Sequence, residues 1–177
     1  MYPRHVLLAC DETDLLLFPP LRATWAPRGE PAPVFISGWN AKRVLFGAIH
    51  LRTGRRLFLA RKRHKAEDFK EFLWLIHHHY RAWHVTLLLD EDKSHIAGGT
   101  RELARKLGIE LLWLPKRSPQ LNPMDHLWRE PKKVVCANHQ YATIDEEVER
   151  VTKYLLGLSP KEALCRAGIL SPDFWLR

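Results

Sequence analysis

The chain has 177 residues, of which 46% are apolar and 27% charged, so it can build one domain with a real core and is not intrinsically disordered. Lysine and arginine number 28 against 20 aspartates and glutamates, a formal net charge of +8 that favours a polyanionic partner. The three cysteines form no CxxC pair, and neither a signal peptide nor an apolar run of roughly 20 residues for a membrane span occurs. We therefore expect a soluble protein of a reducing intracellular compartment.

The first predicted element is a buried strand over residues 5–10, an apolar run that stops at Asp11 and Glu12. Residues 15–18 either continue this strand or pair with it. Residues 19–40 contain five prolines and a Pro-Arg-Gly turn, a pattern that predicts a hairpin-like insertion with irregular ends.

Two further strands are predicted over residues 43–51 and 56–61, joined as an antiparallel hairpin through Thr53-Gly54. Basic side chains crowd the tip and the exit of this hairpin. Residues 66–80 then carry apolar side chains at spacings of three, four and seven, which predicts a helix with one buried face.

The next segment has the clearest pattern: a strand over residues 84–89 that stops at Asp90, a helix over 100–107 and a second strand over 109–114. Elements of these lengths in this order predict a parallel crossover with short loops. In open α/β sheets chemistry collects at the carboxyl ends of strands, where Asp90 would lie.

Three helices complete the chain. The first begins at Asn122, a good N-cap followed by proline, and Pro131 inside it predicts a bend. Residues 144–156 predict an amphipathic helix, and Ser-Pro-Lys-Glu at 159–162 is a capping box that starts the last one. We expect the last two of these helices, within residues 143–177, to pack on the sheet as part of a single domain.

The order of the elements indicates the fold class. A three-stranded antiparallel start is continued by parallel crossovers, which is the topology of ribonuclease-H-like domains. We therefore predict an α/β fold: a ribonuclease-H-like mixed five-stranded sheet with flanking helices and a hairpin insertion after the first strand.

Asp11, Asp90 and Asp125 come from two strand ends and one helix start, and together they predict a metal site. Two divalent ions roughly 4 Å apart need such a cluster, because one activates a hydroxyl and the other stabilises the leaving oxygen. Each acid also has a simpler interpretation: Asp11 and Asp90 as solvated strand ends, and Asp125 as a residue that closes a capping box. Asp92, on the same strand face as Asp90, and Asp14 are alternative ligands.

Two motifs resemble those of a known family: Leu-Asp-(four residues)-His at 89–95, then LPKRSPQLNPMDHLW at 114–128. Together with Asp-Glu at 11–12, RATWAPRGEP at 22–31 and the hairpin, they resemble the mariner-type transposases and their bacterial insertion-sequence relatives, which are DDE superfamily endonucleases. The resemblance covers residues 5–140, and the 34 residues between the second and third acids, 91 to 124, equal the gap of the family.

The resemblance implies a ribonuclease-H-like catalytic domain in which Asp11, Asp90 and Asp125 bind two Mg²⁺ or Mn²⁺ ions. The chain departs from the family at Glu91, where asparagine usually follows the second acid, and at Pro131, where a helix-compatible residue is expected. The helix-turn-helix modules that open family members are absent from the predicted elements. We therefore expect the catalytic half alone: a second reading frame whose partner is a separately encoded helix-turn-helix half, a truncated copy, or an excised piece.

Further side chains are predicted to assist the acids. Glu12, Glu91 and His95 are auxiliary candidates, and His95 would contact a substrate phosphate or a metal-bound water, with an ordinary loop histidine as the alternative. Basic side chains would form a DNA track, because phosphate contacts position nucleic acid without reading its sequence; the alternative is a solvated hairpin face. Trp25 is expected to touch DNA or another subunit. The DNA-binding candidates are Trp25, Arg28, Arg55, Arg56, Arg61, Lys62, Arg63, Lys116, Arg117, Lys132 and Lys133.

By resemblance, the function is that of a transposase catalytic domain. It would hydrolyse a phosphodiester at the element's end and then join the freed 3′-hydroxyl to target DNA at a TA dinucleotide. The resemblance also implies double-stranded DNA as the substrate, a homodimer, and the bacterial cytoplasm at the nucleoid as the location. Two alternatives remain: a ribonuclease-H-like nuclease that cuts without joining, and an inactive or truncated copy that binds DNA or dimerises without catalysis.

Overall fold

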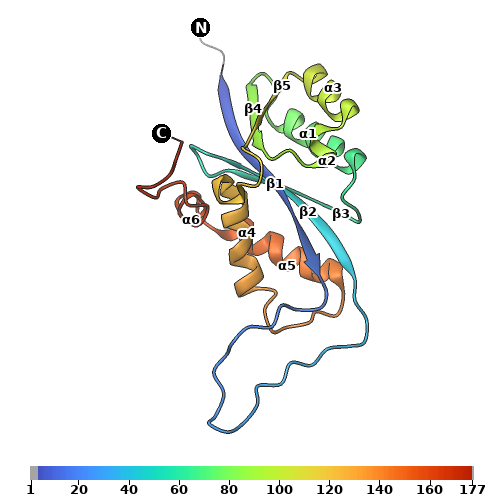
Figure 1. Ribbon diagram of the computed structural model, residues 1–177, viewed down its shortest axis with the longest axis vertical. Coiled ribbons are helices and arrows are strands. Elements are labelled where there is room, and N and C mark those ends of the chain that lie inside the picture. Colours follow the sequence, from blue (N-terminus) through green and yellow to red (C-terminus); the bar gives the residue numbers. More distant parts are fainter. Residues whose placement is uncertain (1–3, 177) are drawn as a thin grey trace.

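The computed structural model describes residues 4–176. A single five-stranded sheet with the order β3-β2-β1-β4-β5 lies at its centre (Figure 1). Within the described residues no helix is long and apolar enough to cross a membrane. The elements are β1 (His5–Leu16), β2 (Lys42–His50), β3 (Arg56–Arg61), α1 (Ala66–His79), β4 (His84–Leu89), α2 (Lys93–Ile96), α3 (Gly98–Lys106), β5 (Ile109–Trp113), a 3₁₀ turn (Pro119–Leu121), α4 (Pro123–Val134), α5 (Ile144–Gly157) and α6 (Pro160–Arg166).

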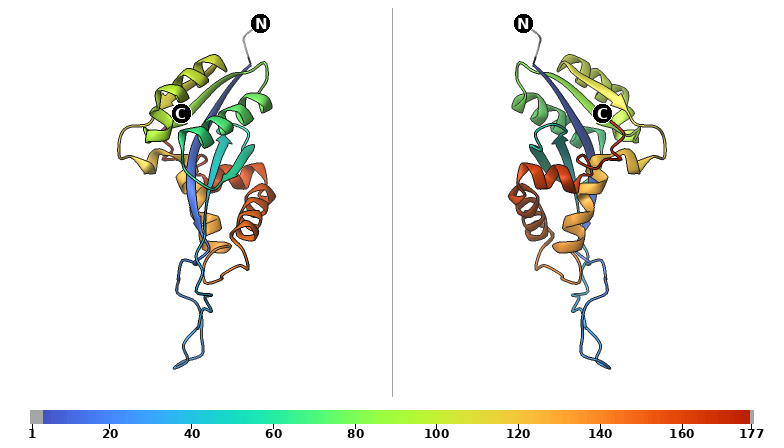
Figure 2. Two further views of the ribbon diagram at one scale, coloured as in Figure 1. Left: turned by 90° about the vertical axis from the view of Figure 1, so that its right-hand side faces the viewer. Right: turned by 90° about the vertical axis from the view of Figure 1, so that its left-hand side faces the viewer.

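The sheet is mixed, as the sequence predicts. β1 pairs antiparallel with β2, and β2 pairs antiparallel with β3. β4 pairs parallel with both β1 and β5, so α1 and the α2–α3 pair are the crossover connections. Helices cover both faces of the sheet, α1 to α3 one face and α4 to α6 the other (Figure 2).

β1 is longer than the predicted strand over residues 5–10, because its antiparallel pairing with β2 continues as far as Leu16. Residues 15–18 in part continue the strand rather than pair with it. The prediction that β1 ends at Asp11 is therefore wrong. The feature that ends near Asp11 is the pairing of β1 with its neighbour β4, which stops at Ala9 and Leu88.

Side chains alternate between the two faces along β1, and this alternation separates two cores. Leu8 and Cys10 pack in the core beneath α1 and α3. Ala9 and Leu15 pack in the core beneath α4 and α5. Asp11 therefore belongs to the α4 face, and Glu12 to the α1 face.

The insertion between β1 and β2 extends far from the sheet as two limbs and a tip, without helix or strand (Figure 1). Its base is closed by Leu17 N–H, which donates to the Ala41 carbonyl at 2.9 Å, and its tip by Glu30 N–H, which donates to the Pro27 carbonyl at 3.0 Å. The predicted hairpin shape is present, but the two limbs are not paired as strands. Prolines explain this, because each removes a donor that a strand ladder requires.

Helix α4 packs directly on the sheet, with Met124, Leu127 and Trp128 buried against it. Pro131 lies inside α4 and is itself buried. The helix continues past it to Val134, so the helix does not restart there. The expected disturbance of α4 by Pro131 is therefore small enough for one helix to span residues 123–134.

Gly47 allows this close approach of α4. A Cβ atom added at Gly47 would lie 2.5 Å from Trp128 Cη2 and 2.7 Å from Met124 Cε. We expect Gly47→Ala to force α4 outward and to lower the free energy of unfolding by about 1–3 kcal/mol, the usual cost of overpacking. Denaturant unfolding would measure this change. The control is Gly38→Ala, where an added Cβ meets nothing within 4 Å; equal effects of the two substitutions would contradict the prediction.

Candidate active site

Asp11 and Asp90 lie level with one another at the carboxyl end of β4. Each follows the last parallel pair, Ala9 and Leu88, by two residues. Neighbouring strands run about 4.8 Å apart, and residues level across a parallel ladder present their side chains to the same face. That face is the α4 face, because Ala9 packs there with Met124.

The first turn of α4 brings Asp125 to the same face. The Asn122 side chain is buried and makes two bonds: Oδ1 accepts from Met124 N–H at 3.0 Å, and Nδ2 donates to the Cys10 carbonyl at 3.0 Å. One amide thus caps α4 and ties it to β1 immediately before Asp11. The carboxylate of Asp125 does not close a capping box; it accepts from Arg129 at 2.6 Å.

We expect Asn122→Ala to lower the free energy of unfolding by about 1–3 kcal/mol, because buried backbone groups lose their partners. Asn122→Ser should cost less, since serine keeps the cap and loses only the bond to Cys10. Both should reduce any activity that depends on the position of Asp125. Guanidinium unfolding measures the first effect, with the exposed Gln120→Ala as the control; equal stability of all three variants and the parent chain would contradict the prediction.

The three carboxylates also share one electrostatic environment. The pKa of Asp11 is raised well above its usual range by burial, by Glu12, and by the negative charges of Asp90 and Asp125. Like charges on one face of the sheet are unfavourable without a cation, although the ligand oxygens of these three described residues do not all lie within 4.8 Å of one another. An all-oxygen set of carboxylates suits Mg²⁺ or Mn²⁺, so Asp11, Asp90 and Asp125 fit a divalent metal site.

His95, on α2, connects this face to the other side of the sheet. Its side chain is fully buried; Nδ1 lies 3.0 Å from Asp90 Oδ1, and Nε2 lies 3.2 Å from Glu12 Oε2. The ring also packs on Phe69, with ring centroids 4.3 Å apart. Both ring nitrogens face carboxylates and the side chain has no exposed surface. The contact of His95 with a substrate phosphate or a metal-bound water stays a prediction.

Charges in this cluster are mutually stabilising. Burial alone would lower the pKa of His95, but the bonds to Asp90 and Glu12 outweigh burial and raise it to about 10. Burial would likewise raise the pKa of Glu12, but bonds from His64 and His95 lower it to about 2. Glu12 Oε1 lies 3.1 Å from His64 Nε2. Sequence analysis did not identify His64, and no spacing or motif marks it.

The other acids considered from the sequence have separate partners. Asp14 is exposed and pairs with Lys42 at 2.6 Å. Asp92 caps α2 by accepting from Ser94 N–H at 2.7 Å. Both therefore have structural contacts that account for them. Glu91 pairs with Lys116 at 3.2 Å, which balances the extra negative charge that it brings beside Asp90.

Three of the basic DNA-binding candidates have protein partners. Arg56 donates to the Leu158 carbonyl at 2.7 Å and so holds the connection between α5 and α6. Arg61 donates to Glu71 at 2.6 Å, and Lys116 pairs with Glu91. The remaining candidates are exposed or, for Lys132, partly exposed: Trp25, Arg28, Arg55, Lys62, Arg63, Arg117, Lys132 and Lys133.

Comparisons with known proteins concern the family and the fold of the chain. A family model described as DDE superfamily endonuclease matches residues 6–147. The insertion element IS630 uncharacterized 39 kDa protein of Shigella sonnei is 27% identical over 158 residues, which cover 88% of this chain and 46% of that protein.

Two solved structures are similar in fold. The Mos1 Strand Transfer Complex has a TM-score of 0.73 at 16% identity, covering 92% of this chain and 51% of that chain. The mariner Mos1 paired-end complex with Mg has a TM-score of 0.71 at 17% identity, again covering 92% and 51%. These similarities confirm the ribonuclease-H-like sheet. The chain spans about half the length of the proteins that it matches.

Proposed function

Since the chain belongs to the DDE superfamily endonuclease family, a family of transposase catalytic domains, we propose that it cuts DNA and joins the cut end to a target. The observation that carries this proposal is the convergence of Asp11, Asp90 and Asp125 on one face at the end of β4. A divalent metal accords with their all-oxygen donor set, and we propose two ions, Mg²⁺ or Mn²⁺. When bound, the ions would polarise the attacking and leaving oxygens of an in-line phosphoryl transfer.

The residues of the chain would position this reaction. Asp11 and Asp90 would hold the ions from adjacent strands, and Asp125 from α4, whose place Asn122 fixes. In the first step water attacks the phosphodiester at the element's end, the bond from phosphorus to the 3′ oxygen breaks, and that oxygen leaves as a hydroxyl. In the second step this 3′-hydroxyl attacks a target phosphodiester, which we place at TA, and the target's own 3′ oxygen leaves.

We propose that the exposed basic side chains contact the phosphates of double-stranded DNA. Arg55, Lys62 and Arg63 extend from the hairpin and its exit, and the net charge of +8 agrees with this role. Recognition of the element's ends would require a further part, and we propose that a helix-turn-helix unit works together with this domain. A protein of this kind would act on the chromosome, in the cytoplasm at the nucleoid.

A joining assay with a pre-cleaved end tests the proposed function. A labelled duplex that ends in a free 3′-hydroxyl is mixed with the protein, Mg²⁺ or Mn²⁺, and a supercoiled plasmid. Covalent joining at TA sites is the expected result. Nicking without joining would favour a nuclease, and the absence of both reactions would favour an inactive copy.

Two structural features argue against an inactive copy. Lys116 neutralises Glu91, and α4 continues through Pro131.

We propose that the insertion contacts a second copy of the chain in a homodimer. Trp25 is fully exposed, and Phe35 and Trp39 are 87% and 80% exposed, a concentration of apolar surface that usually marks an interface. Trp25→Ala should weaken the dimer roughly thirtyfold, which corresponds to the about 2 kcal/mol of an interface tryptophan. Sedimentation equilibrium measures this change. Trp74→Ala, on the exposed side of α1, is the control, and a parent chain that is monomeric at all concentrations would contradict the proposal.

A further inference from the structure

A second cluster of possible metal ligands lies at the opposite end of the sheet from the acidic site. His5, His84 and Glu110 come from β1, β4 and β5, three adjacent strands near their starts. Asp90 follows His84 by six positions, a distance of about 20 Å along an extended strand. The two sites are therefore separate, and changes at one can be tested without touching the other.

Strand pairing brings these side chains together. His5 and His84 are partners in the β1–β4 ladder, with ring centroids 4.8 Å apart. His84 Nε2 lies 3.3 Å from Glu110 Oε2, and the potential ligand atoms of all three residues lie within 4.8 Å of one another. All three side chains are exposed, so small rotations can bring them closer.

We propose that His5, His84 and Glu110 bind a Zn²⁺ ion. Zinc takes imidazole nitrogen and carboxylate oxygen at about 2.0–2.2 Å in tetrahedral sites, so its ligand atoms lie about 3.3 Å apart. The 3.3 Å between His84 Nε2 and Glu110 Oε2 already has this value, and the other ligand atoms lie within 4.8 Å. Two imidazoles and one carboxylate select zinc over magnesium, whereas the three carboxylates at the other end select the reverse.

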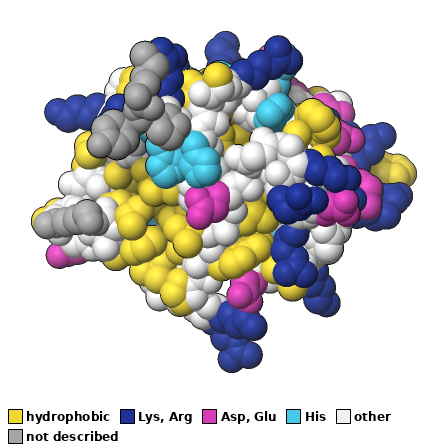
Figure 3. Space-filling model, turned by 90° about the horizontal axis from the view of Figure 1, so that it is seen from above, with side chains coloured by type: hydrophobic (Ala, Val, Ile, Leu, Met, Phe, Trp, Pro, Cys, Tyr) yellow, Lys and Arg dark blue, Asp and Glu magenta, His cyan; other side chains and the backbone are white. Residues whose placement is uncertain are grey.

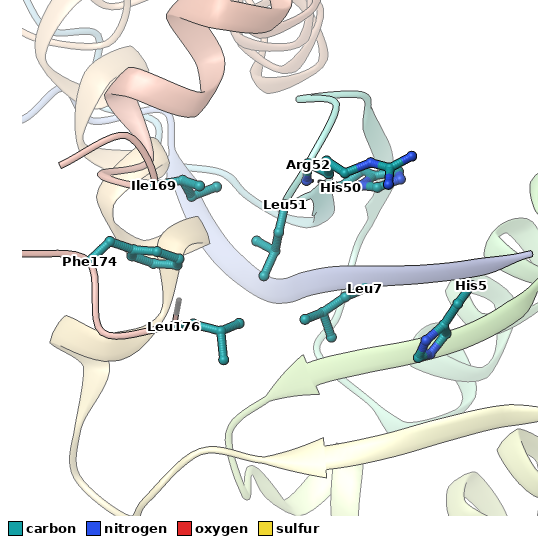
Figure 4. Close-up of a pocket in the computed structure, with 8 residues that line it drawn as sticks. All are labelled: His5, Leu7, His50, Leu51, Arg52, Ile169, Phe174 and Leu176. Atoms are coloured by element: carbon teal, nitrogen blue, oxygen red, sulfur yellow. Dashed lines mark hydrogen bonds between the residues drawn. The ribbon is translucent and has the colours of Figure 1, made fainter. Parts of the chain in front are cut away.

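Neighbouring groups support such a site. The Thr86 hydroxyl donates to Glu110 Oε2 at 2.9 Å and lies 3.0 Å from His5 Nε2, so it orients both ligands from the strand between them. Histidine and acidic side chains meet on this end of the molecule among apolar ones (Figure 3). His5 also lies at one end of a hollow of about 370 Å³ (Figure 4). Three protein ligands would leave the fourth position of a tetrahedral zinc site to water or a small ligand.

Calorimetric titration with Zn²⁺ tests the proposal, using the chain without an affinity tag and with Mg²⁺ in excess. We expect one zinc ion per chain. His84→Ala and Glu110→Gln should each weaken binding by at least about tenfold, since even the loss of an outer partner has that effect. His78→Ala is the matched control, because His78 is exposed at the end of α1 and its ring bonds Arg81 at 3.0 Å; it should bind zinc like the parent chain.

Two further variants keep the result decisive. Thr86→Val removes the hydroxyl that orients His5 and Glu110 and should weaken zinc binding by about tenfold while the stoichiometry stays at one ion per chain. Asp90→Asn should also keep zinc binding, which separates this site from the acidic one. Thermal unfolding without metal verifies that each variant folds. Absence of binding in the parent chain, or binding that survives both His84→Ala and Glu110→Gln, would overturn the proposal.

Discussion

Asp90→Asn is expected to reduce Mg²⁺-dependent DNA nicking by roughly a thousandfold or more. Bound ions contribute several kcal/mol to such a reaction, and every 1.36 kcal/mol is tenfold in rate. Asparagine has the same shape and can still accept from His95 Nδ1, which bonds Asp90 Oδ1 at 3.0 Å. The fold should therefore persist while one negative ligand is lost. Gel assays of plasmid nicking measure the rate, and calorimetry with Mg²⁺ or Mn²⁺ should show weaker binding.

The control for this substitution is Asp14→Asn. Asp14 lies on the same strand as Asp11 but faces the opposite side of the sheet and pairs with the exposed Lys42. Its loss should leave nicking within a factor of about two, as expected of a surface salt bridge worth less than 1 kcal/mol. Nicking by Asp90→Asn at the rate of the parent chain would remove Asp90, and with it the proposed acidic site, from the reaction.

Much of the fold could be predicted from local pattern. Alternation and helical spacing predicted the hairpin of β2 and β3, the helix α1 and the crossover from β4 to β5 because each depends on neighbouring residues. The end of β1 could not be predicted, since it depends on how far the distant β2 remains paired. Whether the two limbs of the insertion pair as strands also depends on their tertiary neighbours, and local sequence patterns do not predict those neighbours.

The candidate site was predictable to a different extent. Asp90 and Asp125 were identified by a specific motif and its 34-residue gap, and Asn122 by its capping pattern. The second bond of Asn122, to Cys10, joins residues 112 positions apart and has no local signal. The same holds for His64, which reaches Glu12 only after β1 and the segment following β3 are packed together.

Two adjacent acids on β1 have different roles because a strand alternates its faces. Asp11 faces α4 and the other two carboxylates. Glu12 faces α1 and forms ion pairs with His64 and His95. The other ring nitrogen of His95 contacts Asp90, so a buried imidazolium holds the Asp90 carboxylate in place. We infer that His95 is a positioning residue for Asp90.

His95→Gln is expected to lower the free energy of unfolding by up to about 3–5 kcal/mol, because it removes one partner of a buried ion pair and leaves Glu12 with His64 alone. Nicking should also fall, since Asp90 loses the bond that orients it. The double variant with Glu12→Gln should recover part of the stability but not the nicking. Full recovery of both would mean that His95 serves stability alone. Urea unfolding and plasmid nicking measure the two effects.

The pH dependence of stability distinguishes the ion pair from simple packing in the metal-free protein. The folded-state pKa of His95, about 10, lies above its ordinary value of 6.5, so its contribution is complete below pH 6.5 and is lost as pH rises through 10. The folded-state pKa of Glu12, about 2, lies below its ordinary 4.5, so its contribution is complete above pH 4.5 and is lost as pH falls through 2. The difference in unfolding free energy between the parent chain and His95→Gln should therefore be largest between pH 4.5 and 6.5 and shrink toward pH 10. A difference that stays constant across this range would show that packing on Phe69, not charge, holds His95 in place.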